Sequence, residues 1–503
     1  MGGKTSALLI RGGRVYRQGE DSHQPPVADV LVEGDRIAAV GPRLNAGPAV
    51  SVIEAAGRLV LPGFINAHYH SHDVLAKGTL EEVPLETWRL YALPPQYPPR
   101  PVEEVYARTL LGALECLRSG MTTVQDMLTL YPFDPTHFDA VMRAYDEIGI
   151  RVTFALQYGD KKGIDTVPFW RETFPPELHA LLSSAAEPEK NFDLLDFVER
   201  TMFQAPPRER VIWALGPSSP ERCTTPLMRR TIALARRYRA PVFAHIYESR
   251  GMAVQARLEY PEHGGSLIRR LAAEDALGPH LNLAHSVWLT DDEIALLGAS
   301  KTNVVLNPQS NLKLKNGIPP IRALQDAGVP IALGCDNCSC GDAQNMFQAM
   351  KLFGLLAAIG DETPGPPQAV AAIDAATRGG ARAVGLPDQL GAIEPGYKAD
   401  LTLLTLSDPS FVPLNSVARQ LVFAEAGRAV ETVIVGGKVV VRDGRLATMD
   451  EAAIYAKVEA VMPGFRKDFA AISARIAPLQ PYLERAHRKI WDHPTGTPRM
   501  TPF

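Results

Sequence analysis

Short apolar runs separated by turn residues fill the first sixty residues of the chain. Ala7–Ile10 and Asp29–Val32 are strand candidates, and Gly34-Asp35 is typical of a hairpin turn. The same pattern returns near the C-terminal end, in Ala399–Leu404 and Val433–Val435. Because neither segment is large enough to bury a core alone, we expect the two to pair into one small β-sandwich.

Strand-like and helical patterns alternate between these two segments. Apolar runs end near His70, Asp126, Tyr158, Ser218, Glu248, Trp288, Ser310 and Asp336. Helical stretches separate them, and Thr290–Glu293 has the residues of a capping box. Eight strand–helix units with nearly continuous apolar strands predict an α/β fold of the (β/α)8 TIM barrel type. A doubly wound open sheet is the alternative, but the chain lacks the expected glycine-rich phosphate loop.

These patterns divide the chain into four parts. We expect residues 1–60 to form the N-terminal part of the β-sandwich and residues 61–386 to form the metal-binding barrel. Residues 387–448 would complete the sandwich, and residues 449–503 would form a helical C-terminal extension. We expect this extension to pack on the barrel or on a second subunit.

Composition narrows the classes of function. The chain has 503 residues, is 46% hydrophobic and carries a formal net charge of -4. It therefore offers no basic surface for nucleic acid, and no apolar run approaches the length of a membrane span. The five cysteines are an odd number, which does not suggest a disulfide framework. With no visible secretory signal, we expect a cytoplasmic protein without a nucleic-acid or membrane partner.

Two histidines at the end of the first barrel strand are the first candidate metal ligands. His68 and His70 follow the apolar run Arg58–Leu61. Residues two apart on a strand point to the same face, and paired neutral imidazoles make half of a divalent-metal site. The competing interpretation is a pair of core histidines held by hydrogen bonds.

Further ligand-type residues end later strands. His245 and His285 end the fifth and sixth strands, and Asp336 ends the eighth. A carboxylate after so apolar a strand is costly to bury unless a cation accompanies it, although a helix N-cap is an alternative. Glu248 follows His245 by three residues and could transfer a proton to or from water activated by the metal. His285 could bind the metal, orient water or substrate, or cap its strand.

Polar residues and thiols near the last two strands are candidates for the pocket wall. Asn307–Leu314 closes the seventh strand and could shape the pocket or brace its loop. Cys335, Cys338 and Cys340 crowd the loop of Asp336. A structural zinc site needs four ligands, and no second cysteine pair lies nearby, so we favour pocket lining for these thiols.

In combination, these motifs resemble the amidohydrolase superfamily, in its chlorohydrolase and aminohydrolase branch with cytosine-deaminase-like relatives. The resemblance runs from about residue 5 to residue 446. It rests on segments that occur in the family's order: Pro62–His70, Gly120–Asp126, His245–Glu248, Leu283–His285, Asn307–Lys313, Gly334–Asp336 and Ile393–Leu401. His72 and the loop Asn337–Cys340 depart from the family's pattern.

The resemblance implies a site and its roles. His68, His70, His245 and Asp336 would hold one divalent metal, with zinc favoured and iron or manganese as alternatives. Glu248 would shuttle protons, and His285 would orient the hydrolytic water or the substrate. Asp336 would also act as a catalytic residue, because an anionic ligand beside the hydrolytic water would help to orient and deprotonate it. The residues expected to contact substrate are His72, Trp88, Gln125, Asn311 and Cys338.

The expected function is a metal-dependent deaminase. Its small-molecule substrate would be a nitrogen heterocycle or aromatic amine, from which hydrolysis releases ammonia. The alternatives are hydrolysis of another C–N or C–Cl bond on the same scaffold, as in an amide, urea, guanidine or chlorinated triazine, and a non-catalytic scaffold barrel. We also expect a homodimer or higher homo-oligomer.

Overall fold

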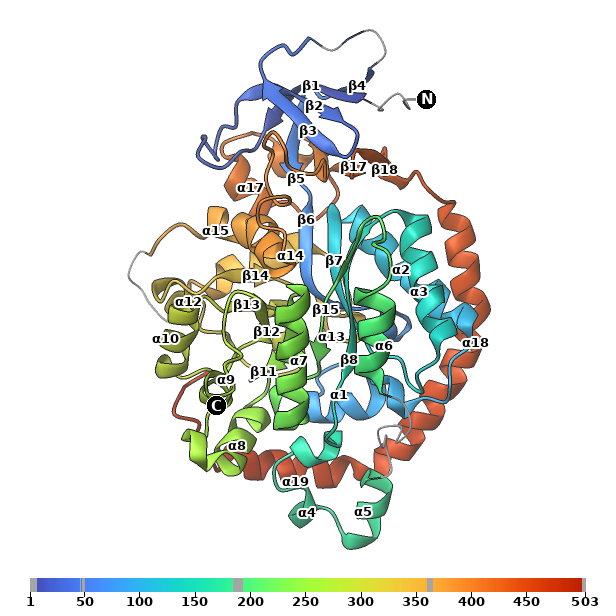
Figure 1. Cartoon of the computed structure of the whole chain (residues 1–503), viewed down its shortest axis with the longest axis vertical. Helices are drawn as coiled ribbons and strands as arrows, with labels where there is room; N and C mark the ends of the chain where they lie inside the picture. Colours follow the sequence, from blue (N-terminus) through green and yellow to red (C-terminus); the bar gives the residue numbers. More distant parts are fainter. Residues whose placement is uncertain (1–6, 46, 48–49, 184–192, 360–364, 500–503) are drawn as a thin grey trace.

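The computed structural model describes residues 7–45, 47, 50–183, 193–359 and 365–499. Strands and helices alternate through its central part, so the predicted α/β class is confirmed (Figure 1). Among these residues, every helix is too short or too polar to span a bilayer.

Parallel strands follow one another in chain order through the centre of the molecule. They are β6 (Phe64–His70), β7 (Met121–Leu128), β8 (Arg151–Tyr158), β9 (Val211–Trp213) with β10 (Gly216–Pro217), β11 (Val242–Ile246), β12 (Leu281–His285), β13 (Asn303–Leu306) and β14 (Ile331–Leu333) with β15 (Asp336–Asn337). A bridge from Leu215 to Val242 joins the fourth position to the fifth. The last strand returns to the first, because β15 pairs in parallel with β6 at Asp336 and Tyr69. The carboxyl ends of these parallel strands therefore lie on the same side.

Helices surround the parallel strands. Those of seven or more residues in this part are α1 (Leu85–Ala92), α2 (Val102–Arg118), α3 (Pro135–Ile148), α5 (Pro176–Ser183), α7 (Thr225–Tyr238), α8 (Arg250–Glu259), α9 (Leu267–Ala273), α10 (Asp291–Ser300), α14 (Met346–Leu356) and α15 (Gln368–Asp374). Shorter ones are α4 (Trp170–Thr173), α6 (Leu194–Phe197), α11 (Pro308–Lys313), α12 (Ile321–Asp326), α13 (Cys338–Gly341) and α16 (Gly380–Ala383). The capping box of α10 is present as predicted: the Thr290 hydroxyl and the Glu293 carboxylate each bind the other's backbone.

The seventh strand ends earlier than the sequence suggested. It stops at Leu306, and Pro308 then opens helix α11. Proline is well suited to the first turn of a helix because its missing N–H is not needed there. Ser310 and Asn311 therefore lie on a helix instead of extending the strand.

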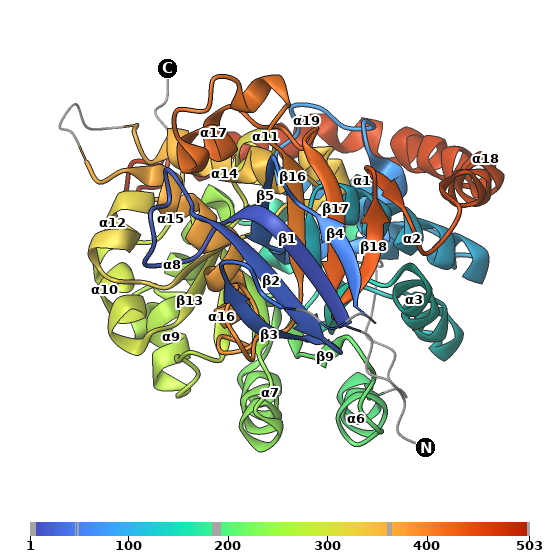
Figure 2. The same ribbon diagram turned by 90° about the horizontal axis from the view of Figure 1, so that it is seen from above.

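Both ends of the described chain contribute to one nine-stranded sheet, which Figure 2 shows from above. Its members are β1 (Ala7–Val15), β2 (Val27–Glu33), β3 (Arg36–Gly41), β4 (Ser51–Glu54), β5 (Arg58–Pro62), β16 (Leu401–Thr405), β17 (Val430–Val435), β18 (Lys438–Arg442) and β19 (Arg445–Leu446). Strand β5 joins the two halves by pairing with β1 and, in antiparallel register, with β16. One apolar cluster packs Ile10 and Val32 with Leu403 and Ile434. The expected association of the two chain ends is therefore present.

A buried ion pair ties this sheet to the parallel strands. Arg151, the first residue of β8, donates two hydrogen bonds of 2.8 and 2.9 Å to the carboxylate of Asp400. Asp400 lies just before β16 and also accepts a 2.7 Å bond from the backbone of Gly436. Because the carboxylate is fully partnered, its burial is tolerated.

Three helices follow within or after the C-terminal sheet strands: α17 (Val417–Phe423), α18 (Glu451–Ile476) and α19 (Gln480–Trp491). Helix α18 runs along one side of the molecule, and α19 crosses its lower end near α4 and α8 (Figure 1). Phe465 packs with Leu75, and Ile476 and Leu483 pack with Trp170. The extension therefore packs on the chain's own central part, one of the two positions expected for it.

Candidate metal centre and active site

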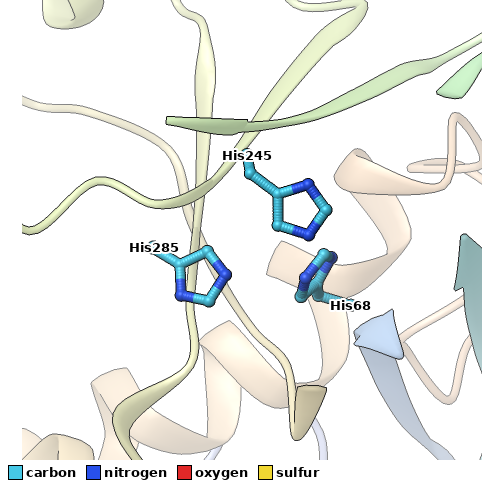
Figure 3. Close-up of side chains that lie close together, drawn as sticks. All are labelled: His68, His245 and His285. Atoms are coloured by element: carbon cyan, nitrogen blue, oxygen red, sulfur yellow. The ribbon is translucent and has the colours of Figure 1, made fainter. Parts of the chain in front are cut away.

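Four histidine rings and one carboxylate converge at the carboxyl ends of the strands. His70 Nε2 lies 3.2 Å from His68 Nε2 and 3.3 Å from His245 Nε2. Asp336 Oδ1 lies 3.5 Å from His68 Nε2 and 3.4 Å from His70 Nε2. His285 completes the group, with Nε2 at 3.7 Å from Asp336 Oδ2. Figure 3 shows how the rings of His68, His245 and His285 face one another.

Hydrogen bonds behind the rings determine which nitrogen faces the centre. His70 Nδ1 lies 2.6 Å from the backbone oxygen of Met127, and His245 Nδ1 lies 2.6 Å from that of Ser218. A carbonyl oxygen can only accept, so each Nδ1 carries the hydrogen and each Nε2 presents a lone pair. This is the arrangement that orients imidazoles as metal ligands.

Two of the converging residues have an unusual backbone. His285 and Asp336 have φ angles of 71° and 63°, in the left-handed region that residues with a Cβ rarely occupy. Such angles turn the chain sharply where β12 ends and β15 begins, and they occur often at functional sites. Gly334, just before Asp336, lies so close to β6 that a Cβ there would come within 2.6 Å of His68 Cβ. Glycine therefore allows the eighth strand to approach the first.

Electrostatics favour neutral imidazoles beside an ionised carboxylate. Burial lowers the pKa of His68 to about 4 and also lowers the pKa of His70 and His245. Burial alone would raise the pKa of Asp336, but the hydrogen bond with His68 and the nearby His285 hold it well below its usual range. Neutral histidine and ionised aspartate are the forms that bind metals.

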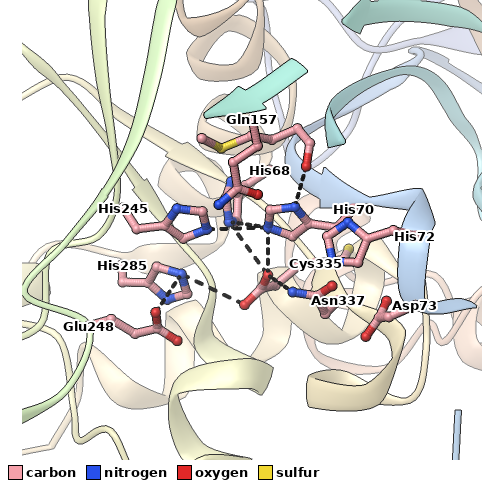
Figure 4. A network of polar contacts seen from close by, with 12 residues as sticks. His68, His70, His72, Asp73, Gln157, His245, Glu248, His285, Cys335 and Asn337 are labelled. Atoms are coloured by element: carbon pink, nitrogen blue, oxygen red, sulfur yellow. Dashed lines mark hydrogen bonds and ion pairs between the residues drawn. The ribbon is translucent and has the colours of Figure 1, made fainter. Parts of the chain in front are cut away.

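Glu248 lies at the edge of this group, next to His285. Its Oε2 is 3.7 Å from His285 Nε2, and its Oε1 accepts a 3.1 Å hydrogen bond from the Asn316 side chain. Burial raises the pKa of Glu248 to about 6. A carboxyl group with a pKa near neutrality can both accept and return a proton, as a general acid–base group must. Figure 4 shows Glu248 and His285 facing the same centre as His68, His70 and His245.

A divalent cation fits this donor set. The lone pairs of His70 and His245 face each other at 3.3 Å, and a buried carboxylate lies next to them. Both features are unfavourable by themselves, and a shared cation would relieve both. Three groups of described residues could hold a metal: His68, His70 and Asp336; His68, His245 and His285; and Glu248, His285 and Asp336. His285 can therefore reach the same centre as the expected ligands.

A small inner cavity of about 40 Å³ adjoins the centre. Its walls include His72 and Trp88, two of the expected substrate contacts. The Trp88 indole donates a 2.7 Å hydrogen bond to Ser339, which fixes the ring against the loop after Asp336. His72 Nδ1 accepts a 3.4 Å bond from the backbone of Thr129, while its Nε2 is buried without a partner in the part of the chain that the structure describes.

The other expected substrate contacts lie outside the wall of this cavity. Asn311 lies behind His285 and accepts a 2.9 Å bond from its Nδ1. Gln125 shares a face of β7 with Met127, which belongs to the inner apolar layer, so it lies below the site. Cys338 is buried, and its sulfur accepts from Gln344. The wall instead contains Cys340. Cys338 and Cys340 lie two residues apart on helix α13, so their side chains point in different directions.

Several site residues were not predicted. Asn316 holds Glu248, and Arg89 and Arg222 line the inner cavity. Asp73 binds the backbone of Cys338 and Ser339 and thereby holds the loop after Asp336 in place. These residues lie on short helices and loops, where no periodic pattern marks the inward face. The proximity of Asp73 to His70 and His72 in the sequence was the one available signal.

Comparison with known proteins agrees with this geometry. A model of the Amidohydrolase family matches residues 59–440. The chain belongs to this family. A 5-methylthioadenosine/S-adenosylhomocysteine deaminase from Pyrococcus furiosus is 32% identical over 430 residues, which cover 86% of this chain and 94% of the relative.

Two solved structures are similar over most of the chain. A zinc-bound adenosine deaminase from Xanthomonas campestris has a TM-score of 0.78 and 28% identity, and the match covers 92% of this chain and 99% of that protein. An atrazine chlorohydrolase from Arthrobacter aurescens TC1, complexed with zinc, has a TM-score of 0.77 and 25% identity, with 91% and 100% covered.

The family and the site together confirm the predicted resemblance and activity. This amidohydrolase is a hydrolytic enzyme that acts on C–N bonds, and its function as a metal-dependent deaminase agrees with its deaminase relatives. The cluster of histidines with Asp336 supports a divalent metal as its cofactor.

Proposed function

We propose that this amidohydrolase deaminates an adenine nucleoside and that His68, His70, His245 and Asp336 hold one zinc ion. The observation that carries the proposal is the position of Glu248, whose Oε2 lies 3.7 Å from His285 Nε2 at the edge of the metal centre. The two deaminases most informative about substrate, from Pyrococcus furiosus and Xanthomonas campestris, are named for adenine nucleosides or their derivatives.

The chemistry would use this chain's side chains for proton movement. When bound, a divalent metal lowers the pKa of water toward neutrality. Glu248 would take a proton from the attacking water and deliver it to the ring nitrogen beside the amine-bearing carbon. A C–O bond forms at that carbon, and the C–N bond then breaks. The new hydroxyl gives up its remaining proton as it becomes a carbonyl, and the amine takes that proton and leaves as ammonia. His285, held through Nδ1 by Asn311, would orient the water or the developing oxygen with Nε2.

A panel assay tests this function. Metal-loaded protein is incubated with adenosine, 5′-deoxyadenosine, cytosine, guanine and an amino-triazine, and released ammonia is measured. We expect the adenine nucleosides to be preferred. The Glu248→Gln variant should keep its metal and lose turnover by a factor on the order of 10² or more. Preferential release from another heterocycle, or full turnover by Glu248→Gln, would contradict the proposal.

We propose an architecture and a setting to accompany this function. The parallel strands would close into a (β/α)8 barrel over residues 61–386, and residues 1–60 with 387–448 would form the β-sandwich. The five cysteines are all free and buried, which suits a reducing, cytoplasmic setting. A homodimer or higher homo-oligomer is proposed as well, and light scattering after size-exclusion chromatography tests it.

A further inference from the structure

A second, larger cavity adjoins the metal centre. Its volume is about 330 Å³, compared with about 40 Å³ for the inner cavity. Arg89, Leu93 and Arg222 line both, so the two spaces meet at these residues. The inner cavity has room for only a few waters. A heterocyclic substrate whose reacting carbon lies at the metal centre must therefore extend toward the larger, outer cavity.

The C-terminal extension forms one wall of the outer cavity. Ile476, Leu479 and Leu483 lie on it, opposite Leu90 of α1. These three residues follow residue 440, where the match to the family model ends. This wall therefore belongs to a part of the chain that the family pattern does not specify, and its apolar side chains suit an apolar portion of a ligand.

Two arginines at the junction of the cavities form no ion pair with a carboxylate of the described residues. Arg89 makes no hydrogen bond or ion pair with any described residue. Arg222 donates one long bond of 3.5 Å to the backbone of Lys161, and its Nε has no partner among the described residues. Burial, followed by the positive charge of Arg89, lowers the pKa of Arg222 to about 10. An anion placed between them would relieve this unfavourable proximity.

The acidic groups nearby form no ion pair with the two arginines in the part of the chain that the structure describes. The Glu86 carboxylate lines the outer cavity but accepts a 2.5 Å bond from Ser249 and faces His487 at 3.6 Å. Glu221 is the acidic group whose charge acts on both arginines, but its two carboxylate oxygens are buried without a hydrogen-bond partner among the described residues. One carboxylate can balance only one of the two guanidinium groups. The remaining cation, Arg475, is bound to Gln96.

We propose that the outer cavity binds the part of the substrate beyond the reacting ring, and that Arg89 and Arg222 select an anionic group on that part. The substrate class is an amino-heterocyclic nucleoside whose sugar carries a carboxylate or a phosphate at its 5′ end. Leu479 and its neighbours in the extension contact the apolar atoms between the ring and the anion. The inference rests on the proposed function, because it assumes that the reacting ring is an amino-heterocycle.

Kinetics with matched substrates test the arginines. Adenosine, adenosine 5′-monophosphate and adenosine 5′-carboxylate are compared on the wild type, Arg89→Met and Arg222→Met. We expect kcat/KM for one or both anions to fall by a factor of 10 to 100 more than kcat/KM for adenosine, mainly through KM. The phosphate and carboxylate arms identify which anion is preferred. Arg229→Met, at an exposed position on α7 outside both cavities, should change none of these values.

A second pair of variants tests the wall. Leu479→Ala should raise KM severalfold for adenine nucleosides with a 5′-thioether chain, and kcat should not change. Ile472→Ala is the matched control, because Ile472 packs in the same apolar cluster but does not line the cavity. Equal effects of the two variants would mean that the extension acts only on stability.

Binding separates failure of this inference from failure of the proposed function. Calorimetry with Glu248→Gln measures the affinity of adenosine and of its two anionic forms without turnover. In one outcome, the wild type deaminates no nucleoside, while the anionic forms still bind more tightly than adenosine and lose that advantage in the Arg222→Met variant. In that case the cavity assignment stands and the proposed reaction is wrong. The inference is overturned if the anionic forms bind no more tightly than adenosine and if Arg89→Met and Arg222→Met leave the ratio of these affinities unchanged.

Discussion

Asn311 holds His285 in position through a 2.9 Å hydrogen bond between Asn311 Oδ1 and His285 Nδ1. The two residues come from different elements: His285 ends β12, and Asn311 lies on α11. The bond places the hydrogen on Nδ1 and leaves Nε2 facing Asp336 and Glu248, each at 3.7 Å. A side chain that was expected to contact substrate thus positions the ring of His285.

Replacing Asn311 tests this role. Asn311→Leu removes the acceptor, so His285 loses its fixed tautomer and orientation. We expect kcat to fall by a factor on the order of 10 to 100, with metal content unchanged by elemental analysis. Asn303→Leu is the control, since Asn303 is also buried and hydrogen-bonded but lies away from the centre, where it donates to Pro279. Similar losses in both variants would assign Asn311 a purely structural role.

Metal removal should abolish activity and lower stability. We expect one equivalent of metal per chain, and chelation followed by dialysis should leave no measurable turnover. Adding zinc should restore it. Because the cation would bind only the folded arrangement of the proposed ligands His68, His70, His245 and Asp336, the metal-free protein should also unfold at lower denaturant concentration. Two metals per chain, or activity that survives complete removal, would disprove this site.

The two thiols after Asp336 should differ in their effect on substrate choice. Cys340 lines the inner cavity, whereas Cys338 does not. Cys340→Ser changes the polarity of the wall at nearly constant volume, so relative turnover among amino-heterocycles should change by severalfold. Cys338→Ser should scale every substrate's rate alike. If Cys340→Ser also changes the turnover of every substrate by the same factor, Cys340 makes no selective contact.

The buried carboxyl group of Asp73 should make stability depend on pH. Burial raises its pKa to about 7, above the value of about 4 expected in the unfolded chain. The folded state therefore holds a proton that the unfolded state releases, so this contribution is complete below about pH 4 and is lost as the pH rises to about 7. We expect the stability difference between wild type and Asp73→Asn to decline over this range, by at most about 4 kcal/mol. Denaturant titrations at several pH values measure it, and a constant difference would refute the assignment.

The ion pair between Arg151 and Asp400 should couple the sheet to the parallel strands. Asp400→Asn leaves a buried guanidinium without its counter-charge, which costs about 3–5 kcal/mol in comparable pairs. The double variant Arg151→Met, Asp400→Leu removes both charges and should recover much of this loss. Unfolding followed by fluorescence and circular dichroism measures both. If the double variant is as unstable as the single one, the charge pair is not the cause.

Much of this protein could be predicted from local sequence patterns. His68 and His70 were predicted to face the same side because side chains alternate along a strand with a period of two. Asp336 was predicted to lie near a cation because an unpaired charge is costly to bury after an apolar strand. Parallel strands that follow one another must end on the same side, so ligand-type residues at these ends were expected to meet. Local signals also located the capping box before α10.

The contacts between distant segments were decided only by tertiary structure. No periodic pattern indicates that Asn311 would face His285, that Cys340 and not Cys338 would reach the cavity, or that Asp73 would bind the loop at Ser339. These pairings depend on the directions of short helices such as α11 and α13, and a rotation of one residue changes which side chain points inward. The outer cavity depends on where α18 and α19 pack, and apolar residues such as Leu479 could equally have faced another surface. The sequence determined the chemistry of the metal centre because ligand type and strand register are local properties, whereas the shape of the substrate cavity arose from packing between segments hundreds of residues apart.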